Sequence, residues 1–456
     1  MREKLGSRLG FILLSAGCAI GIGNVWKFPW MVGQYGGAIF VLIYLFFLVM
    51  LGLPVMTIEF AVGRAAQKSP VKMYQEIEPK KTKWHWHGYL ALAGNIILLM
   101  FYTSVTSWMV RYFLDTATGK LSGLDTDGIG AAFGDMLSNP VGMTVLVAII
   151  MIVATLVCMT GVKGGLEKVT KFMMLALLGV MVVLAVNSIF LDGAAEGLKF
   201  YLVPNIDNVK EAGLANVVVG AMNQAFFTLS LGIGSMAIFG SYINKDRALL
   251  GEAVNVAVLD TFVAFTSGLI IFPACFAYGV KPDAGPSLIF QTLPNVFNNM
   301  PGGRIWGSLF FVFMIFAALS TVFAVLENII ACIMDLTGWN RKLASVISGI
   351  GVFVLSLPCI LGFSVWSGFV PFAEGSTIMD LEDFIVSNVL LPFGSLIFVL
   401  FCIIPRYGWG WKNFVAEANQ GKGLKVANWM RWIYMIVVPI IIITILVFGI
   451  VTFKFN

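Results

Sequence analysis

Residues 16–28 read Ala-Gly-Cys-Ala-Ile-Gly-Ile-Gly-Asn-Val-Trp-Lys-Phe and lie within an apolar run long enough to cross a bilayer. Gly21, Gly23 and Asn24 interrupt this run near its middle. Glycine loosens a helix, and a loosened helix leaves backbone N–H and C=O groups without partners. In hydrocarbon each unsatisfied group costs several kcal/mol unless protein, water or a bound solute satisfies it. The stretch is therefore either a defect in the span or a binding site.

The composition of the whole chain indicates a polytopic membrane protein. Of its 456 residues 59% are hydrophobic and 12% are charged, whereas soluble domains carry about 25% charged residues. The net charge of +5 does not indicate a nucleic-acid partner, because the basic residues gather in loops. The only two histidines, His85 and His87, lie in one basic loop, where we expect the neighbouring tryptophans to anchor the interface. Without a histidine inside a span, a histidine-based catalytic or zinc site is disfavoured, so we do not expect an enzyme.

Apolar runs predict an all-α fold with eleven transmembrane helices in a single domain, residues 1–456. The runs are 9–34, 38–63, 86–113, 141–160, 172–192, 214–240, 253–279, 305–334, 343–362, 383–404 and 430–453. If the N-terminus is cytoplasmic, most of the 29 Lys and Arg residues fall in inner segments, as the positive-inside rule requires. We therefore expect a multi-pass protein of the cell inner (plasma) membrane.

The interruption in the first span has a counterpart in the sixth. Gly21-Ile22-Gly23-Asn24 recurs as Gly232-Ile233-Gly234-Ser235. Five spans separate the two copies, and an odd number means that the second copy enters the membrane upside down. Inverted repeats with two broken helices are typical of secondary transporters. We expect a first repeat over 9–192, an inverted second repeat over 214–404, and an extra helix over 430–453.

Oxygen-bearing side chains accompany the two breaks. Asn24, Thr228 and Asp260, together with the Ser320-Thr321 pair, could supply oxygens at membrane depth. Hydroxyls in membrane helices often bond their own helix or join helices, and that reading stays open for each of them. Together with freed carbonyls they form an all-oxygen set that suits a hard cation. Freed N–H groups at the start of the second half-helix favour a carboxylate, so a zwitterionic amino acid would match both.

The sequence also resembles the neurotransmitter:sodium symporter family, in particular its short bacterial members that transport leucine, hydrophobic amino acids or tyrosine. The resemblance extends over nearly the whole chain. The motifs that carry it are 8–10 (RLG), 21–29 (GIGNVWKFP), 58–64 (IEFAVGR), 226–232 (FFTLSLG) and 317–321 (AALST). It implies the leucine-transporter-like fold, with helices 1 and 6 unwound, and transport by alternating access.

The resemblance also implies roles for individual residues. The substrate would contact Ala19, Ile22, Gly23, Leu98, Tyr102, Phe227, Thr228, Ser230, Ile233, Thr321 and Val325. One sodium ion would bind Ala19, Asn24, Thr228 and Asp260, and a second would bind Gly17, Ile20, Ala317, Ser320 and Thr321. The outer gate would be Lys27 with Asp383, the inner gate Arg2 with Asp335, and Glu59 would brace the unwound segments. Two sodium ions would act as coupling ions, with no other cofactor.

Several positions depart from the family pattern. Lys27 stands where most members have arginine, so the outer gate should be looser. Asp260 stands where asparagine is common, and Ala264 stands where chloride-dependent members have serine, so we expect chloride independence. Gly21 carries no carboxylate, so the substrate should bring its own. Leu175 stands at the proline position linked to unwinding of span 5, which puts solvent entry by that route in doubt.

The expected function is sodium-coupled symport that imports a neutral hydrophobic amino acid, aliphatic or aromatic. Two alternatives share the fold: a non-transporting amino-acid sensor, and a symporter for another small zwitterion. A sensor would lose the gates, whereas all four gate residues are present. A channel would need a continuous polar pore, whereas Phe227 and Tyr102 favour a lid. The sequence leaves the oligomeric state open.

Overall fold

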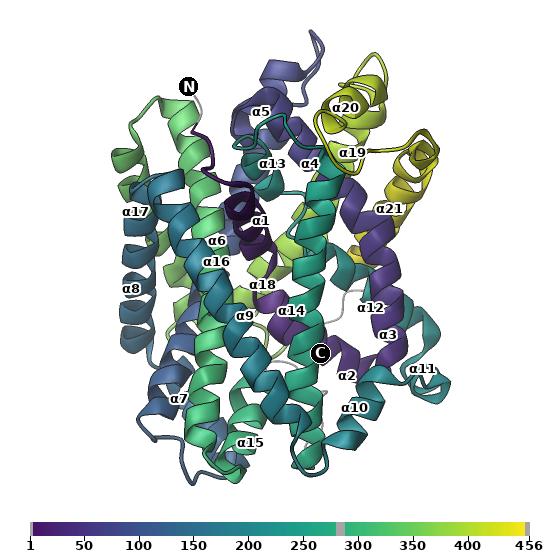
Figure 1. The fold of residues 1–456 in the computed structure, drawn as a ribbon. Coiled ribbons are helices and arrows are strands. Elements are labelled where there is room, and N and C mark those ends of the chain that lie inside the picture. The colour runs from purple at the N-terminus through teal and green to yellow at the C-terminus, as the bar shows by residue number, and fades with distance from the viewer. Residues whose placement is uncertain (1–2, 280–287, 452–456) are drawn as a thin grey trace.

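The computed structural model describes residues 3–279 and 288–451, and the secondary structure of these residues is helical throughout, with no β-strand. The all-helical prediction is thus confirmed, and the helices stand side by side in a tall bundle (Figure 1). The α-helices are α1 (Arg8–Ala19), α2 (Phe28–Gln34), α3 (Ala38–Phe47), α4 (Leu53–Ala66), α5 (Pro70–Ile77), α6 (Trp86–Ala117), α7 (Thr126–Leu137), α8 (Pro140–Met159), α9 (Glu167–Ile189), α10 (Ala194–Leu202), α11 (Ile206–Ala212), α12 (Leu214–Phe227), α13 (Ser235–Gly240), α14 (Leu249–Ala277), α15 (Leu293–Asn299), α16 (Gly303–Thr337), α17 (Arg341–Leu361), α18 (Ile378–Phe384), α19 (Leu391–Ile403), α20 (Trp411–Ala418) and α21 (Val438–Val451). Short π-helical or 3-10 turns are Gly23–Lys27, Leu48–Gly52, Val162–Leu166, Leu288–Thr292, Ile385–Leu390, Asn428–Met430 and Ile433–Val437.

Among the described residues, nine helical segments are long and apolar enough to cross a membrane. A tenth is a bent pair, Arg8–Ala19 and Gly23–Gln34, whose two halves meet at 59°. The expected sixth crossing is divided between α12 and α13, and each part is too short to span by itself. The count by length is therefore nine or ten rather than the expected eleven, because glycines end helices inside the expected crossings.

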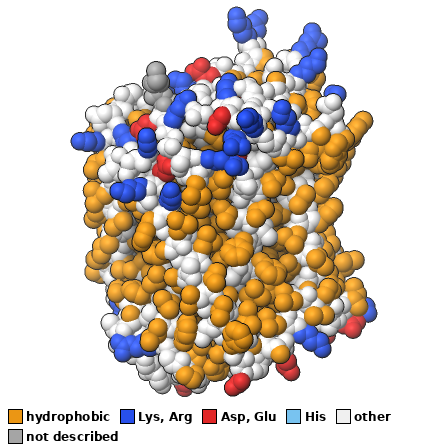
Figure 2. All heavy atoms as spheres, viewed as in Figure 1, with side chains coloured by type: hydrophobic (Ala, Val, Ile, Leu, Met, Phe, Trp, Pro, Cys, Tyr) orange, Lys and Arg blue, Asp and Glu red, His pale blue; other side chains and the backbone are white. Residues whose placement is uncertain are grey.

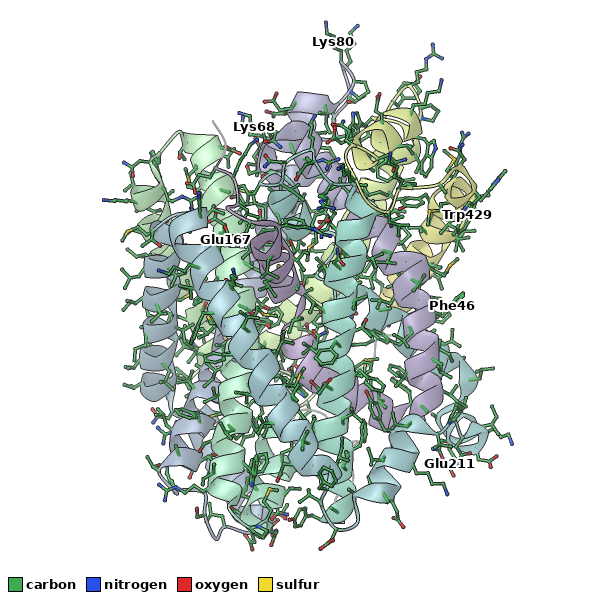
Figure 3. The ribbon with its side chains drawn as sticks, viewed as in Figure 1. Phe46, Lys68, Lys80, Glu167, Glu211 and Trp429 are labelled. Carbon is green, nitrogen blue, oxygen red and sulfur yellow. The ribbon has the colours of Figure 1, made fainter. Side chains whose placement is uncertain are left out.

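The outer surface of the bundle is apolar over its middle and charged at its ends. Figure 2 shows this pattern, with Lys and Arg gathered at the upper end, beside α5 and α20 of Figure 1. Large side chains such as Phe46 on α3 point away from the bundle (Figure 3), and Phe46 is 58% exposed. Lys68 and Lys80 lie at the same upper end, hereafter the basic end, and Glu211 lies at the opposite end. Such a continuous apolar band suits hydrocarbon and would be a liability in water.

The centre of the bundle holds the two interrupted helices. Helix α1 packs against α9, α14 and α16, and α13 packs against α4. The α4–α13 contact is close because Gly63 faces the Ala237 carbonyl, where a β-carbon would overlap that oxygen. This packing places both breaks among α4, α6, α14 and α16 rather than at the surface.

Candidate functional site

The first break lies between α1 and the turn that begins at Gly23. Helix α1 ends at Ala19, and Ile20 is extended, with φ −70° and ψ 98°. The carbonyls just before the break therefore lose their helical partners. The stretch that decided the sequence interpretation thus lies buried at the centre of the protein.

The second break lies between α12 and α13. Ser230 has φ 50°, Gly232 φ 100° and Gly234 φ 72°. A left-handed serine is uncommon, so its neighbours must hold it there. Glu59 on α4, fully buried, accepts a hydrogen bond from the Gly232 N–H at 2.5 Å. The structure thus places Glu59 against this break, where the sequence expected a brace.

Three polar side chains meet between the breaks and α14. Asn24 Nδ2 donates to Thr228 Oγ1 at 3.0 Å and to Asp260 Oδ1 at 2.8 Å. Thr228 Oγ1 donates to the second carboxylate oxygen, Oδ2, at 3.0 Å. All three are at most 1% exposed, and within the described residues no Lys or Arg pairs with Asp260. A buried carboxylate with only neutral donors is a favourable place for a cation. Ala19, expected in the same sodium site, lines the adjoining cavity.

A second oxygen cluster surrounds Thr321 on α16. Its Oγ1 lies 3.3 Å from the Gly17 carbonyl oxygen, 3.4 Å from those of Cys18 and Ile20, and 3.5 Å from that of Ala317. One hydroxyl has a single proton, so it can satisfy only one of these four carbonyls. Ser320 Oγ donates to the Ala317 carbonyl at 2.9 Å. The structure brings together all five residues expected for the second sodium site.

The candidate cation sites are built from hydroxyls, amides and carbonyls. Within residues 3–279 and 288–451, no three His, Cys, Asp or Glu side chains lie together as a group that could hold a metal ion. Oxygen ligands of this kind favour hard cations over zinc or copper.

A narrow cavity of about 20 Å³ lies beside the two clusters, enough for about one water molecule. Its walls are Cys18, Ala19, Gly21, Gly23, Leu98, Tyr102, Phe227, Thr228, Ser230, Thr321 and Leu391. The Ile22 N–H, expected to bind a substrate carboxylate, donates to the Tyr102 hydroxyl at 3.0 Å. Ile233 and Val325, expected in the side-chain pocket, are buried but do not line the cavity. An amino acid could enter only if wall side chains move aside.

The expected gate residues are arranged differently at the two ends. Lys27 Nζ lies 3.9 Å from the centre of the Phe227 ring, a cation–π contact. Asp383 accepts from Ser387 Oγ at 2.7 Å, and the described residues show no ion pair between Lys27 and Asp383. Of the inner pair, Arg2 lies outside the described residues, and Asp335 Oδ2 accepts from the Ser69 N–H at 2.8 Å.

Arg341 links α16 to the segment before α1 at the basic end of the bundle. The sequence analysis did not single it out. Its guanidinium binds Glu327 through two hydrogen bonds of 2.7 and 3.0 Å and Glu3 through a third of 2.9 Å. Tyr242 also donates to Glu327, at 2.7 Å. In the sequence Arg341 is one basic residue of a loop, and its position two residues before the expected span 343–362 is the available signal. Cys18 and Leu391, which line the cavity, were also missed.

His87 is buried, contrary to its expected place at the interface. Its Nδ1 lies 2.8 Å from the hydroxyl of Tyr74 on α5. Burial raises the pKa of the Tyr74 hydroxyl well above its ordinary value, so that group stays protonated and can donate to the ring. The basic loop was expected to include His87. Helix α6 instead begins at Trp86, and His87, its second residue, is buried.

Comparison with known proteins agrees with this architecture. The profile of the sodium:neurotransmitter symporter family matches residues 2–126 and 132–456. The sodium-dependent transporter YhdH of Bacillus subtilis is 36% identical over 451 residues, 98% of each chain. The sodium-dependent serotonin transporter of Drosophila melanogaster is 25% identical, over 99% of this chain and 77% of that one. The crystal structure of MhsT in complex with L-phenylalanine superposes with a TM-score of 0.86 at 37% identity, covering 98% of this chain and all of that one. The chain therefore belongs to the sodium:neurotransmitter symporter family, a family of secondary transporters and not of enzymes.

Proposed function

We propose that this protein is a sodium-coupled symporter that imports a neutral hydrophobic amino acid by alternating access. The observation that carries the proposal is that two oxygen clusters flank one cavity where two helices break. Free backbone groups in the middle of a membrane protein are tolerated where they line a cavity or bind a solute. The breaks supply both free backbone N–H groups and free carbonyl groups. The carboxylate of a zwitterion would bind the N–H groups, and its ammonium group and the accompanying cations would bind the carbonyls.

Two sodium ions are the coupling ions in this proposal. One would bind at Asn24, Thr228 and Asp260 with the Ala19 carbonyl, and the other among the carbonyls around Thr321. Moving one charge across about 100 mV releases about 2.3 kcal/mol, so two ions with a neutral zwitterion release about 4.6 kcal/mol. At about 1.4 kcal/mol per tenfold change, this supports roughly a thousandfold accumulation.

The cavity wall favours an uncharged, apolar substrate side chain. Among the described residues no Lys, Arg, Asp or Glu lines the cavity, and Leu98, Phe227 and Leu391 supply apolar surface. Gly21 has no carboxylate side chain, so the carboxylate of the substrate itself would lie near the backbone amides of Ile22 and Gly23. The phenylalanine bound in MhsT supports an amino acid of this kind.

In the proposed topology the chain crosses the membrane eleven times, and α12 and α13 together form the sixth crossing. Two inverted repeats extend over 9–192 and 214–404. The basic end would lie on the cytoplasmic side of the plasma membrane, as the positive-inside rule suggests. Lys27 with Asp383 would close the outer side, and Arg2 with Asp335 the inner side.

Chloride independence follows from the charge of Asp260. With sodium bound, an ionised Asp260 carboxylate would supply the negative charge beside the first ion, so no chloride would be needed to balance it. Uptake should persist when chloride is replaced by gluconate, and a collapse of uptake would refute this part.

The deciding experiment is uptake of labelled amino acids into proteoliposomes under an inward sodium gradient. The proposal expects saturable uptake that depends on sodium, with leucine, phenylalanine and similar compounds among the competitors. Binding without uptake would indicate a sensor, and uptake that never saturates would indicate a channel. Competition only by zwitterions that are not hydrophobic amino acids would indicate the alternative symporter.

A further inference from the structure

Two asparagines from different helices converge on one backbone carbonyl at the second break. Asn95 Nδ2, on α6, donates to the Ile233 carbonyl at 2.7 Å, and Asn328 Nδ2, on α16, lies 3.5 Å from the same oxygen. Asn328 Nδ2 also donates to Asn95 Oδ1 at 3.1 Å. Both amides are at most 1% exposed. We call this pair the amide clasp.

The amide clasp has no bonding capacity left for a ligand at Asn95. Its Nδ2 donates to the Ala91 and Ile233 carbonyls, both at 2.7 Å. Its Oδ1 accepts from Asn328 Nδ2 and, at 3.4 Å, from Ser235 Oγ. An asparagine side chain can make four such bonds, so all are used. A fully satisfied buried network fixes its members in one arrangement, which indicates a positioning role and not a binding one.

The position of the clasp relates it to the expected side-chain pocket. Asn95 precedes Leu98 by three residues on α6, and Asn328 follows Val325 by three residues on α16. Residues three apart share one face of a helix. Ile233 is also expected in that pocket, and its backbone carbonyl is the one that both asparagine amides approach. Helix α6 also contacts its side chain directly, because a β-carbon at Gly94 would lie 2.8 Å from Ile233 Cγ2.

We propose that the amide clasp positions Ile233 and thereby sets the size of the substrate side chain that the transporter accepts. The inference rests on the proposed amino-acid transport and adds two specificity-determining residues that do not touch the substrate. Without the clasp, residues 229–234 can retreat from α6 and α16, so large side chains gain relative to small ones.

The test replaces Asn328 by leucine, which keeps the size and removes the hydrogen bonds. Valine and tryptophan compete with labelled substrate for uptake, and the ratio of their half-inhibitory concentrations is the readout. Asn328→Leu should shift this ratio at least tenfold toward tryptophan while the sodium half-saturation stays within twofold. Asn216→Leu is the control, since Asn216 is exposed on α12 and its amide donates to the Ala212 carbonyl at the end of the neighbouring α11. Asn95→Ser and Asn328→Ser serve as a second route if the leucine variant is not recovered folded.

The outcomes separate the inference from the proposed function. A ratio within twofold of the wild type in a variant that still transports would overturn the inference alone. A shift in sodium half-saturation with an unchanged ratio would show a general structural role and also overturn it. A wild-type protein that transports no amino acid would overturn both.

Discussion

Replacing Thr321 by valine tests the second cation cluster most directly. Valine has the same shape but no oxygen, so the four carbonyls within 3.5 Å of Thr321 Oγ1 lose their shared hydroxyl. With sodium bound, the ion loses one oxygen ligand, and an interaction with a charged partner contributes about 1.5–3 kcal/mol. Without sodium, one ordinary hydrogen bond of about 1 kcal/mol is lost, which partly offsets that difference. The net weakening of sodium binding should be roughly 0.5 to 2 kcal/mol.

At about 1.4 kcal/mol per tenfold, this weakening raises the sodium half-saturation about two- to thirtyfold. The assay measures amino-acid uptake as a function of sodium concentration. A second sodium titration follows the tryptophan fluorescence of the protein in detergent, without amino acid. Thr57→Val is the matched control, because Thr57 is also buried and its hydroxyl donates to the Leu53 carbonyl of its own helix, at 2.7 Å. A half-saturation within twofold of the wild type, or an equal shift in Thr57→Val, would refute the assignment of sodium to this cluster.

Three further substitutions test the cavity and its two closures. Gly23→Ala places a methyl group 2.9 Å from the Phe227 ring, so amino-acid binding in a scintillation-proximity assay should weaken at least tenfold; unchanged affinity would contradict the cavity assignment. Lys27→Arg should lower the maximal uptake rate several-fold, because a guanidinium stacks on Phe227 and binds a carboxylate through two parallel hydrogen bonds; a faster rate would count against Lys27 as a gate. Arg341→Lys removes the paired bonds to Glu327 and the guanidinium bond to Glu3. Glu3 lies in the segment before α1, so hydrogen exchange in that segment should increase, and equal protection would argue that it is held by other contacts.

The sequence indicated where the helices would end because glycine acts locally. Gly21 and Gly23 lie just beyond the end of α1, and Gly232 and Gly234 lie between α12 and α13. Backbone freedom is a property of the residue itself and therefore shows in the sequence. The meeting of Asn24 with Asp260 is different, since 236 positions separate them and only the repeat pattern and the family motifs pointed to it.

Side-chain orientation could not be predicted in the same way. The pairing of Lys27 with Asp383 was expected from the family, whereas the ammonium lies over Phe227. A lysine has four rotatable bonds and no fixed donor geometry, so its position does not determine its partner. His87 was expected at the interface and Asn95 was not singled out, because single polar residues beside or in apolar runs resemble interface anchors or helix-joining residues. Only three-dimensional contacts show which groups they satisfy.

Counting hydrogen-bond capacity separates the polar groups at the centre by role. Asn95 has four bonding positions and four partners, so nothing remains for a solute. Thr321 faces four carbonyls with one proton, and Ser230 and Ser320 donate to only two of them. The Asp260 carboxyl group meets only neutral donors. The excess of oxygen over donors lies at the breaks of both helices, and the saturated groups lie one turn away from the cavity. A cation would relieve that excess, so we expect the protein to be most stable when its ions are bound.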